Sequence, residues 1–194
     1  MIDEVDQALV NGLRAREPEA FDRLYARYRE RLWAFLVRLT RDRAEAEDLF
    51  QESWLSAARN AHRLEEGSDV RAWLYTIARN KQRSSRRFLL LDFSRKEALA
   101  HDPPETAPLQ DAQLERRREL RAVERALDGM KEAHREVILL SVIEGLDTAA
   151  LATVLGLSAE VVRKRLSRAR AELHEALALA EHGAATDAGK GRTT

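Results

Sequence analysis

Apolar residues recur at three- and four-residue steps along most of the chain, which predicts a series of amphipathic helices. The longest stripe runs from Phe21 to Leu39, after Pro18, and predicts a long core helix there. Further helices are expected at about residues 4–15, 44–60, 70–87, 112–129, 132–144, 148–155 and 158–181. The period breaks at 88–111, where three prolines forbid a continuous helix. The apolar run at 88–91 leaves two alternatives, an anchor on the preceding domain or a fraying helix end.

The composition favours helices throughout. The 194 residues are 44% hydrophobic and 34% charged, with only 8 Gly and 4 Pro, and they are rich in Ala, Leu, Arg and Glu. The sequence therefore predicts an all-α fold of two helical domains, 1–90 and 112–182, joined by a flexible linker at 91–111. The small polar residues of 183–194 predict a disordered tail.

Several classes of site and location are unlikely from the residues present. With Cys 0, the chain offers no disulfide, zinc ribbon or thiol nucleophile, and its five His lie far apart without ligand spacing. We therefore expect no metal and no cofactor. The acidic start MIDEVDQALV does not resemble a signal peptide, and no apolar run approaches the roughly 20 residues of a membrane span. A cytoplasmic protein without membrane insertion is expected.

The charges cancel overall but are sharply segregated. Lys plus Arg and Asp plus Glu number 33 each, yet 42–69 is acidic, whereas 71–96 and 163–170 are basic. This pattern predicts two basic surfaces for one extended polyanion and an acidic surface for another partner.

Residues 145–173 carry the spacing of a helix-turn-helix. Ala152, Gly156 and Val162 stand where the motif needs a small residue at the helix crossing, a turn residue with positive φ and a buried apolar residue. Ser158 is expected to cap the second helix, which has an apolar side and an opposite side with Arg163, Lys164, Ser167 and Arg168. This face predicts contacts to DNA bases and phosphates, with Arg170 adding a backbone contact. The plainer alternative is a solvated basic face on a helical hairpin.

The helix at 69–87 is the second DNA-binding candidate. Its apolar wedge includes Val70, Trp73 and Leu74 and leaves an arc that we expect to be exposed. One flank of the arc carries Arg71, Tyr75, Arg79, Gln82 and Arg86, and the other carries Thr76, Asn80, Arg83 and Arg87. Cations, amides and an aromatic ring suit phosphates together with unpaired bases. A merely soluble Arg-rich helix is the alternative.

A polar ridge is predicted on the helix at 44–60, where Asp48 and Glu52 lie one turn apart beside Gln51. The inward side is expected to hold Ala46, Leu49, Phe50, Trp54, Leu55 and Ala58. The ridge fits a solvated face or a docking surface for a basic partner helix. A metal-binding or acid–base role is disfavoured because no His or second carboxylate helix accompanies it.

Three blocks of the sequence together resemble a known family. They are LYARYRERLWAFLVRLTRDRAEAEDLFQESWL, RAWLYTIARNKQRSSRR and, after the Pro-bearing linker, HREVILLSVIEGLDTAALATVLGLSAEVVRKRLSRARAEL. Their order looks like that of the extracytoplasmic-function (ECF) sigma factors, two-domain members of the bacterial sigma-70 family, over about residues 18–178. The resemblance implies a dissociable, non-enzymatic subunit that directs bacterial core RNA polymerase to promoters, with region 2 before the linker and region 4 after it.

The resemblance also implies site residues and partners. Core polymerase would be bound through its β′ clamp helices by Asp48, Gln51 and Glu52, and through its β flap. The −10 promoter element would be captured by the loop and helix at 62–87, with DNA-binding residues Arg71, Tyr75, Arg79, Asn80, Arg83, Arg86 and Arg87. The −35 element would be read by the helix at 158–172, with Glu160, Arg163, Lys164, Arg165, Ser167 and Arg168. An anti-sigma factor is expected as a regulator, since family members are commonly held inactive by one.

Two departures from the family leave the −35 preference open. Thr148, Ala149 and Ala150 stand where the family often has Tyr and two Glu, and Glu160 and Val161 replace a common Gly-Thr pair. Two other functions compete with the sigma-factor interpretation. One is a stand-alone, dimeric helix-turn-helix regulator, which leaves the blocks at 44–60 and 69–87 unexplained. The other is a helical carboxylate enzyme with a metal.

Overall fold

The computed structural model describes residues 4–91 and 111–190, and over these residues it is helical and contains no strand. This confirms the all-α prediction. The elements of the first domain are α1 (Glu4–Arg14), α2 (Pro18–Thr40), α3 (Arg43–Asn60), η1 (Ala61–Arg63) and α4 (Val70–Leu91). Those of the second domain are α5 (Asp111–Gly129), α6 (Glu132–Ile138), η2 (Leu139–Ile143), α7 (Thr148–Leu155) and α8 (Ala159–Lys190). None of the described helices combines the length and apolar character needed to cross a membrane.

Carboxylate caps set three of the helix starts. The Asp42 side chain accepts hydrogen bonds from the backbone N–H groups of Ala44 and Glu45 at the start of α3. Asp69 does the same for Ala72 in α4, and Asp147 for Ala150 in α7. These caps satisfy N–H groups that have no partner inside the helix, which is why the sequence-based starts of these helices agree with the structure.

The first domain packs around the apolar stripe of α2. Leu24, Leu32 and Leu36 are fully buried between α1, α3 and α4. One prediction for α3 is wrong: Leu55 is 57% exposed and Ala58 is exposed, while Ser53 and Ala57 are fully buried. Ser53 can lie inside because its hydroxyl donates a 2.6 Å hydrogen bond to the Leu49 carbonyl, one turn earlier.

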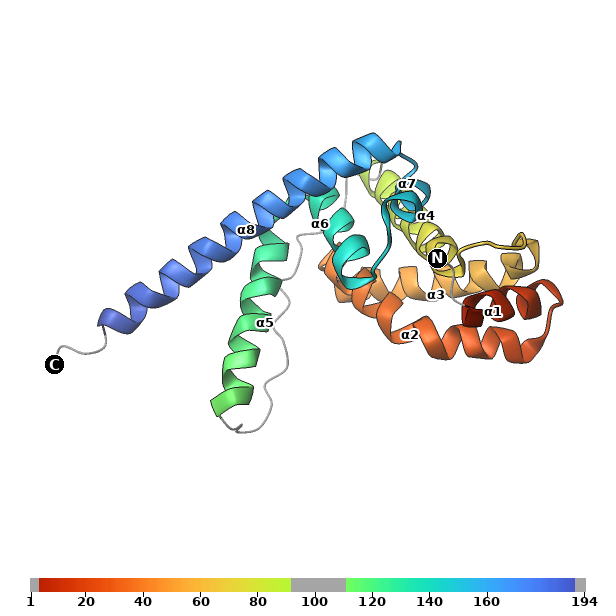
Figure 1. The fold of residues 1–194 in the computed structure, drawn as a ribbon, viewed down its shortest axis with the longest axis horizontal. Helices are drawn as coiled ribbons and strands as arrows, with labels where there is room; N and C mark the ends of the chain where they lie inside the picture. Colours follow the sequence, from red (N-terminus) through yellow and green to blue (C-terminus); the bar gives the residue numbers. More distant parts are fainter. Residues whose placement is uncertain (1–3, 92–110, 191–194) are drawn as a thin grey trace.

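The second domain is built against the long α8, from which α5 extends (Figure 1). The single helix predicted at 132–144 is two elements, because α6 widens into the π-helical turn η2. The Glu144 N–H bonds the Leu139 carbonyl at 3.1 Å, and Gly145 then ends the turn with φ +66°. This wide turn leaves the Glu144 side chain buried, while Val142 and Ile143 are exposed.

Two helix ends extend beyond the predictions. Helix α4 continues to Leu91, so the backbone of the apolar run at 88–91 is helical; the side chains of this run lie outside the described residues. Helix α8 continues to Lys190, although a disordered tail was expected from residue 183. Extending a formed helix costs far less than nucleating one, and the alanines after residue 183 favour the extension. Residues 92–110, which are all but the two end residues of the linker predicted at 91–111, and residues 191–194 lie outside the described residues.

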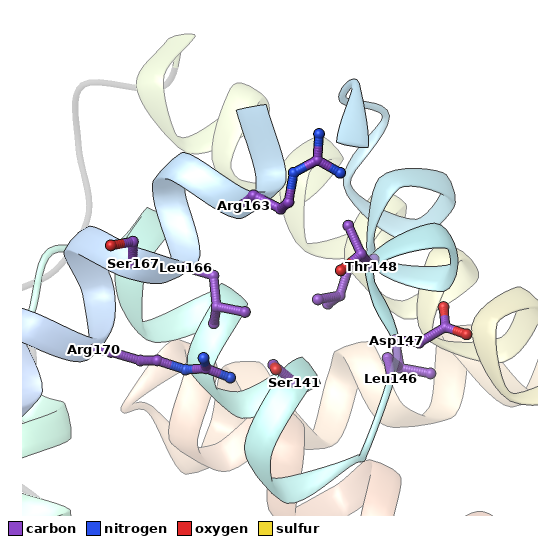
Figure 2. Close-up of a pocket in the computed structure, with 9 residues that line it drawn as sticks. Ser141, Leu146, Asp147, Thr148, Arg163, Leu166, Ser167 and Arg170 are labelled. Atoms are coloured by element: carbon purple, nitrogen blue, oxygen red, sulfur yellow. The ribbon is translucent and has the colours of Figure 1, made fainter. Parts of the chain in front are cut away.

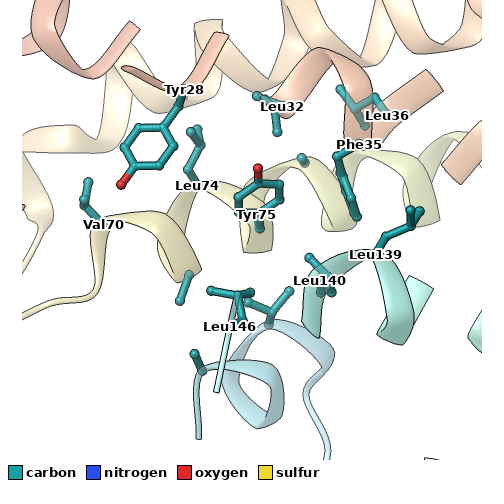
Figure 3. Packing of buried hydrophobic residues seen from close by; sticks show 14 of the residues in the cluster. Tyr28, Leu32, Phe35, Leu36, Val70, Leu74, Tyr75, Leu139, Leu140 and Leu146 are labelled. Atoms are coloured by element: carbon teal, nitrogen blue, oxygen red, sulfur yellow. The ribbon is translucent and has the colours of Figure 1, made fainter. Parts of the chain in front are cut away.

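The two domains pack directly on each other. Figure 3 shows Phe35 of α2 and Tyr75 of α4 beside Leu139 and Leu140 of η2 and Leu146. All five side chains are buried, and the Phe35 and Tyr75 rings meet edge to face with centroids 5.1 Å apart. The buried apolar residues of the two domains therefore form one continuous core.

Candidate nucleic-acid interface

Helices α7 and α8 form the predicted helix-turn-helix. Gly156 ends α7 with φ +61°, a conformation that costs a residue with a side chain about 1–2 kcal/mol. The Leu157 N–H bonds the Ala152 carbonyl at 3.1 Å, and the Ser158 hydroxyl accepts a 3.3 Å bond from the Val161 N–H. Val162 is fully buried. The turn, the cap and the buried position are thus confirmed.

The outward face of α8 is basic and accessible. Arg163, Lys164, Ser167 and Arg168 are exposed, as are Glu160 and Arg170, whereas Arg165 is half-buried. Lys164 donates a 2.6 Å hydrogen bond to Glu160 one turn away, in a pair that is about two-thirds exposed. A pair with that much exposure is weak and can rearrange when a ligand arrives.

A pocket of about 510 Å³ opens between this face and the start of α7 (Figure 2). Arg163, Ser167 and Arg170 line it from α8, and Asp147 and Thr148 line it from the other side. Guanidinium groups together with hydroxyls are groups that bind phosphate oxygens. The face therefore has depth as well as positive charge.

The first flank of α4 is not exposed as predicted, because the second domain covers it. Tyr75 is 0% exposed, Gln82 2% and Arg79 8%. The opposite flank remains open, with Asn80, Arg83 and Arg87 exposed. Of the seven α4 residues predicted to bind DNA, the structure therefore buries Tyr75 and Arg79, half-buries Arg71 and Arg86, and leaves the other three free to bind.

The covered flank is held by polar contacts as well as packing. Arg79 Nε lies 2.7 Å from Glu136 Oε1, and its Nη1 donates a 3.3 Å bond to the Val154 carbonyl. Glu132 accepts a 2.9 Å bond from Gln82 and an ion-paired bond from Arg86. Every polar contact in this set joins α4 to the second domain.

A second cluster of contacts lies at Glu144. Arg71 Nη1 donates a 3.0 Å bond to the Glu144 carbonyl, and Arg31 of α2 pairs with the Glu144 carboxylate at 3.1 Å. Burial, with the nearby Glu144 carboxylate, raises the pKa of the Tyr75 hydroxyl far above its ordinary value. Tyr75 therefore stays neutral at physiological pH.

The acidic ridge on α3 is accessible, as predicted. Asp48, Gln51 and Glu52 are all exposed on one side of the helix. Glu52 Oε2 lies 3.3 Å from Lys81 Nζ of α4, and this ion pair links the ridge to the second candidate DNA-binding helix. No group of three or more His, Cys, Asp or Glu side chains suited to a metal ion occurs within the described part of the chain.

Sequence reasoning missed the residues that join the domains. Besides Glu132, Glu136 and Glu144, these include Arg135, which donates a 2.9 Å bond to the Leu39 carbonyl, and Arg41, which donates a 2.7 Å bond to the Asp128 carbonyl. Desolvation on burial, aided by the positive charge of Arg41, lowers the pKa of Arg135 to about 10. The sequence hints at this contact only through charge, since α4 is rich in Arg and α6 carries two Glu. Charge alone does not identify which residues form contacts between the domains.

The helix-turn-helix with its basic face, joined to a helical domain that carries a second Arg-rich helix, defines a two-domain DNA-binding protein. Comparison with known proteins refines this class. Residues 24–88 match sigma-70 region 2, and residues 120–173 match sigma-70, region 4. The chain belongs to the sigma-70 family and is a sigma factor of the ECF type, a transcription initiation factor that directs RNA polymerase to promoters.

Curated relatives and solved structures agree with this assignment. RNA polymerase sigma factor CarQ of Myxococcus xanthus is 34% identical over 162 residues, covering 82% of this chain and 90% of CarQ. ECF RNA polymerase sigma factor SigL of Mycobacterium tuberculosis is 34% identical over 164 residues, covering 82% and 89%. The solved structure of CnrH in complex with the cytosolic domain of CnrY has a TM-score of 0.66 and 27% identity, covering 91% of this chain and 99% of that chain. The sigma factor RpoE of Bartonella quintana, solved with the anti-sigma factor NepR, has a TM-score of 0.66 and 28% identity, covering 81% and 96%.

Proposed function

We propose that this sigma factor contacts promoter DNA with two helices and core RNA polymerase with a third. The observation that carries the proposal is the exposed basic face of α8, which directly follows the turn of a helix-turn-helix. The match to sigma-70 region 2, over residues 24–88, includes most of α4. The domain limits proposed from the sequence are 1–90 for region 2 and 112–182 for region 4, with the linker at 91–111 between them.

The −35 element is read by α8 in this proposal. Its reading residues are Glu160, Arg163, Lys164, Arg165, Ser167 and Arg168. Support comes from the exposure of all of them except the half-buried Arg165. Arg and Lys side chains match guanine edges in the major groove, and a Glu accepts a hydrogen bond from the cytosine amino group. A break of the Lys164–Glu160 pair would free both side chains for such contacts.

The −10 element is held by α4 in this proposal. Its DNA-binding residues are Arg71, Tyr75, Arg79, Asn80, Arg83, Arg86 and Arg87. The flank with Asn80, Arg83 and Arg87 is already accessible, and the other becomes so when the domains separate. Guanidinium groups hold the strand by its phosphates, while Asn and Tyr hydrogen bond to or stack on unpaired bases. Promoter opening then needs no covalent chemistry, so we propose that the chain is not an enzyme and uses no cofactor.

The ridge of Asp48, Gln51 and Glu52 docks the β′ clamp helices of core polymerase in this proposal, and the second domain contacts the β flap. The ridge is exposed and acidic, which suits a basic partner helix. Two weak DNA contacts on one chain become strong together only when both promoter elements lie at the right separation. A chain of zero net charge is expected to bind DNA poorly until polymerase joins it.

We further propose a cytoplasmic location, where RNA polymerase acts, and an anti-sigma factor as regulator. The two structural neighbours support the second point, because each was solved in a complex, CnrH with the cytosolic domain of CnrY and RpoE with NepR.

The docking proposal is tested by measuring the affinity of labelled chain for core polymerase. The variant Asp48→Arg with Glu52→Arg is expected to lose binding by about 100-fold, because it replaces two attractive charges by repulsive ones. The matched control is Glu19→Arg with Glu30→Arg, which makes the same charge change at exposed positions of α2. Wild-type binding by the ridge variant would contradict docking through the ridge, and an equal loss of binding in both variants would contradict it too, because binding would then depend on net charge alone.

A further inference from the structure

The pocket between α7 and α8 combines an apolar wall with a polar rim. Leu146 and Leu151 line it and are buried, and the half-buried Leu166 projects into it from α8 (Figure 2). The residues of the rim are polar or charged: Ser141, Asp147, Thr148, Arg163, Ser167 and Arg170. A cavity of about 510 Å³ has the size of a small-molecule site, for which about 300–1,000 Å³ is typical.

We propose that this pocket binds a nucleoside diphosphate, with the base against the leucines and the diphosphate between Arg163 and Arg170. The two arginines are seven residues apart, so they lie on the same side of α8, about 10 Å from each other along its axis. Figure 2 shows them at opposite ends of the pocket, with Leu166 between them. Two separated cations suit two linked phosphates better than a single inorganic phosphate.

The donors of the rim are available to a ligand. Arg163 and Arg170 are exposed, and neither forms a hydrogen bond or ion pair with another described residue. The hydroxyl groups of the rim are equally unbonded within the described ranges, and they belong to Ser141, Thr148 and Ser167. Guanidinium and hydroxyl groups are common partners of phosphate oxygens. A ligand therefore displaces no internal contact of the protein when it binds to these donors.

Asp147 makes the pocket selective among anions. It is the one carboxylate among the residues that line the pocket, and its Oδ1 accepts a 2.8 Å hydrogen bond from the Ala150 N–H at the start of α7. A carboxylate repels a bare polyphosphate but accepts hydrogen bonds from the hydroxyls of a ribose, as it does in dinucleotide-binding folds. The apolar wall, the carboxylate and the two guanidinium groups together favour a nucleotide over inorganic pyrophosphate or a free nucleoside.

A bound nucleotide competes with DNA for the same side chains. Arg163 and Ser167 line the pocket and are also among the residues proposed to read the −35 element. A guanidinium group that holds a diphosphate is not free to bind a base edge or a backbone phosphate. The nucleotide is therefore an inhibitor of promoter binding by α8. This consequence rests on the proposed function of α8, whereas the nucleotide site does not.

The site is tested by titrating the full chain with ADP and GDP in a calorimeter, without Mg²⁺ and at about 0.05 M salt, where screening is weak. At least one nucleotide is expected to bind at least about tenfold more tightly than adenosine or pyrophosphate, since each of these lacks one half of the contacts. Arg170→Gln should weaken nucleotide binding by about tenfold. The matched control is Arg168→Gln, which makes the same charge change at an exposed position of α8 outside the pocket.

Three results would overturn the nucleotide site. They are the absence of binding by both nucleotides at millimolar concentration, binding of pyrophosphate as tight as that of ADP and GDP, and an equal loss in Arg170→Gln and Arg168→Gln. The last two would identify only a basic surface that attracts polyanions. Circular dichroism of the two variants, which change exposed side chains, confirms that each is folded.

Competition is measured with a fluorescent, mixed-sequence DNA duplex under the same conditions, where electrostatic binding of DNA is strong. A saturating concentration of the nucleotide that binds should weaken duplex binding by about tenfold, and the same concentration of pyrophosphate, which controls for ionic strength, should have a smaller effect. If the nucleotide binds but duplex binding does not change, the inhibitory consequence is wrong and the proposed DNA contacts of Arg163 and Ser167 fail with it. If the duplex binds and neither nucleotide does, the inference is overturned and the proposed promoter function is untouched.

Discussion

Glu172 shows how one side chain joins separate helices of the second domain. From α8 it accepts a 2.9 Å hydrogen bond from the Lys131 N–H at the start of α6, and its other oxygen meets His134 Nδ1. The hydrogen bond from His134, followed by that from the Lys131 N–H, holds the pKa of the Glu172 carboxyl below its ordinary value. The ionised form is therefore the one that stabilises the fold.

Glu172→Gln is expected to lower the unfolding free energy by about 1 kcal/mol at pH 7. Because the folded-state pKa lies below the ordinary value of about 4.3, the wild-type advantage is complete above that pH and disappears as the pH falls through the lowered pKa. Thermal unfolding of both proteins between pH 7 and pH 3 measures this difference. A difference that stayed constant down to pH 3 would contradict an electrostatic role for Glu172.

At the scale of elements, local chemistry explains most of what the sequence predicted. The apolar stripe of α2 and the turn at Gly156 act within a few residues, so the sequence shows them directly. The Asp42, Asp69 and Asp147 caps seen in the structure are equally local and fix helix starts that the apolar pattern had placed. The prediction of which α3 residues face inward was partly wrong. The buried Ser53 hydroxyl is hydrogen-bonded within its own helix, so this polar residue can face the core. The π turn at η2 was missed because one wide turn within a helix leaves the apolar pattern of the sequence largely unchanged.

Gly156→Ala tests the helix-turn-helix turn. Open space surrounds the position where the new Cβ would lie, so the cost comes from the positive φ alone and is expected to be about 1–2 kcal/mol of unfolding free energy. Gly129→Ala is the matched control, because it also has open space but no positive φ, and it should be neutral or stabilising. Equal effects in urea unfolding of the two variants would show that the Gly156 conformation is not required.

At the scale of the whole molecule, the two domains share one core although they belong to separate family regions. The contacts that join them connect residues far apart along the chain, such as Arg31 with Glu144 and Arg135 with Leu39. A sequence shows the charge of each segment but not which segments meet at such separations. The exposure predicted for Tyr75, Arg79 and Gln82 therefore failed, even though their place on one helix flank was correct.

The shared core predicts cooperative unfolding. The wild-type chain is expected to give one calorimetric transition whose calorimetric and van't Hoff enthalpies agree. Glu132→Gln with Glu136→Gln should weaken the coupling and broaden or split the transition, while Glu175→Gln should not. Two separate transitions in the wild type would show that the domains unfold independently.

The measurement that tests the central claim most directly is run-off transcription with core polymerase and genomic DNA fragments from the source organism. The account predicts specific transcripts that require the chain, disappear with Asp48→Arg plus Glu52→Arg and persist with Glu19→Arg plus Glu30→Arg. It would be contradicted by the absence of any specific transcript together with tight binding of duplex DNA by the chain alone, which is the behaviour of a stand-alone regulator.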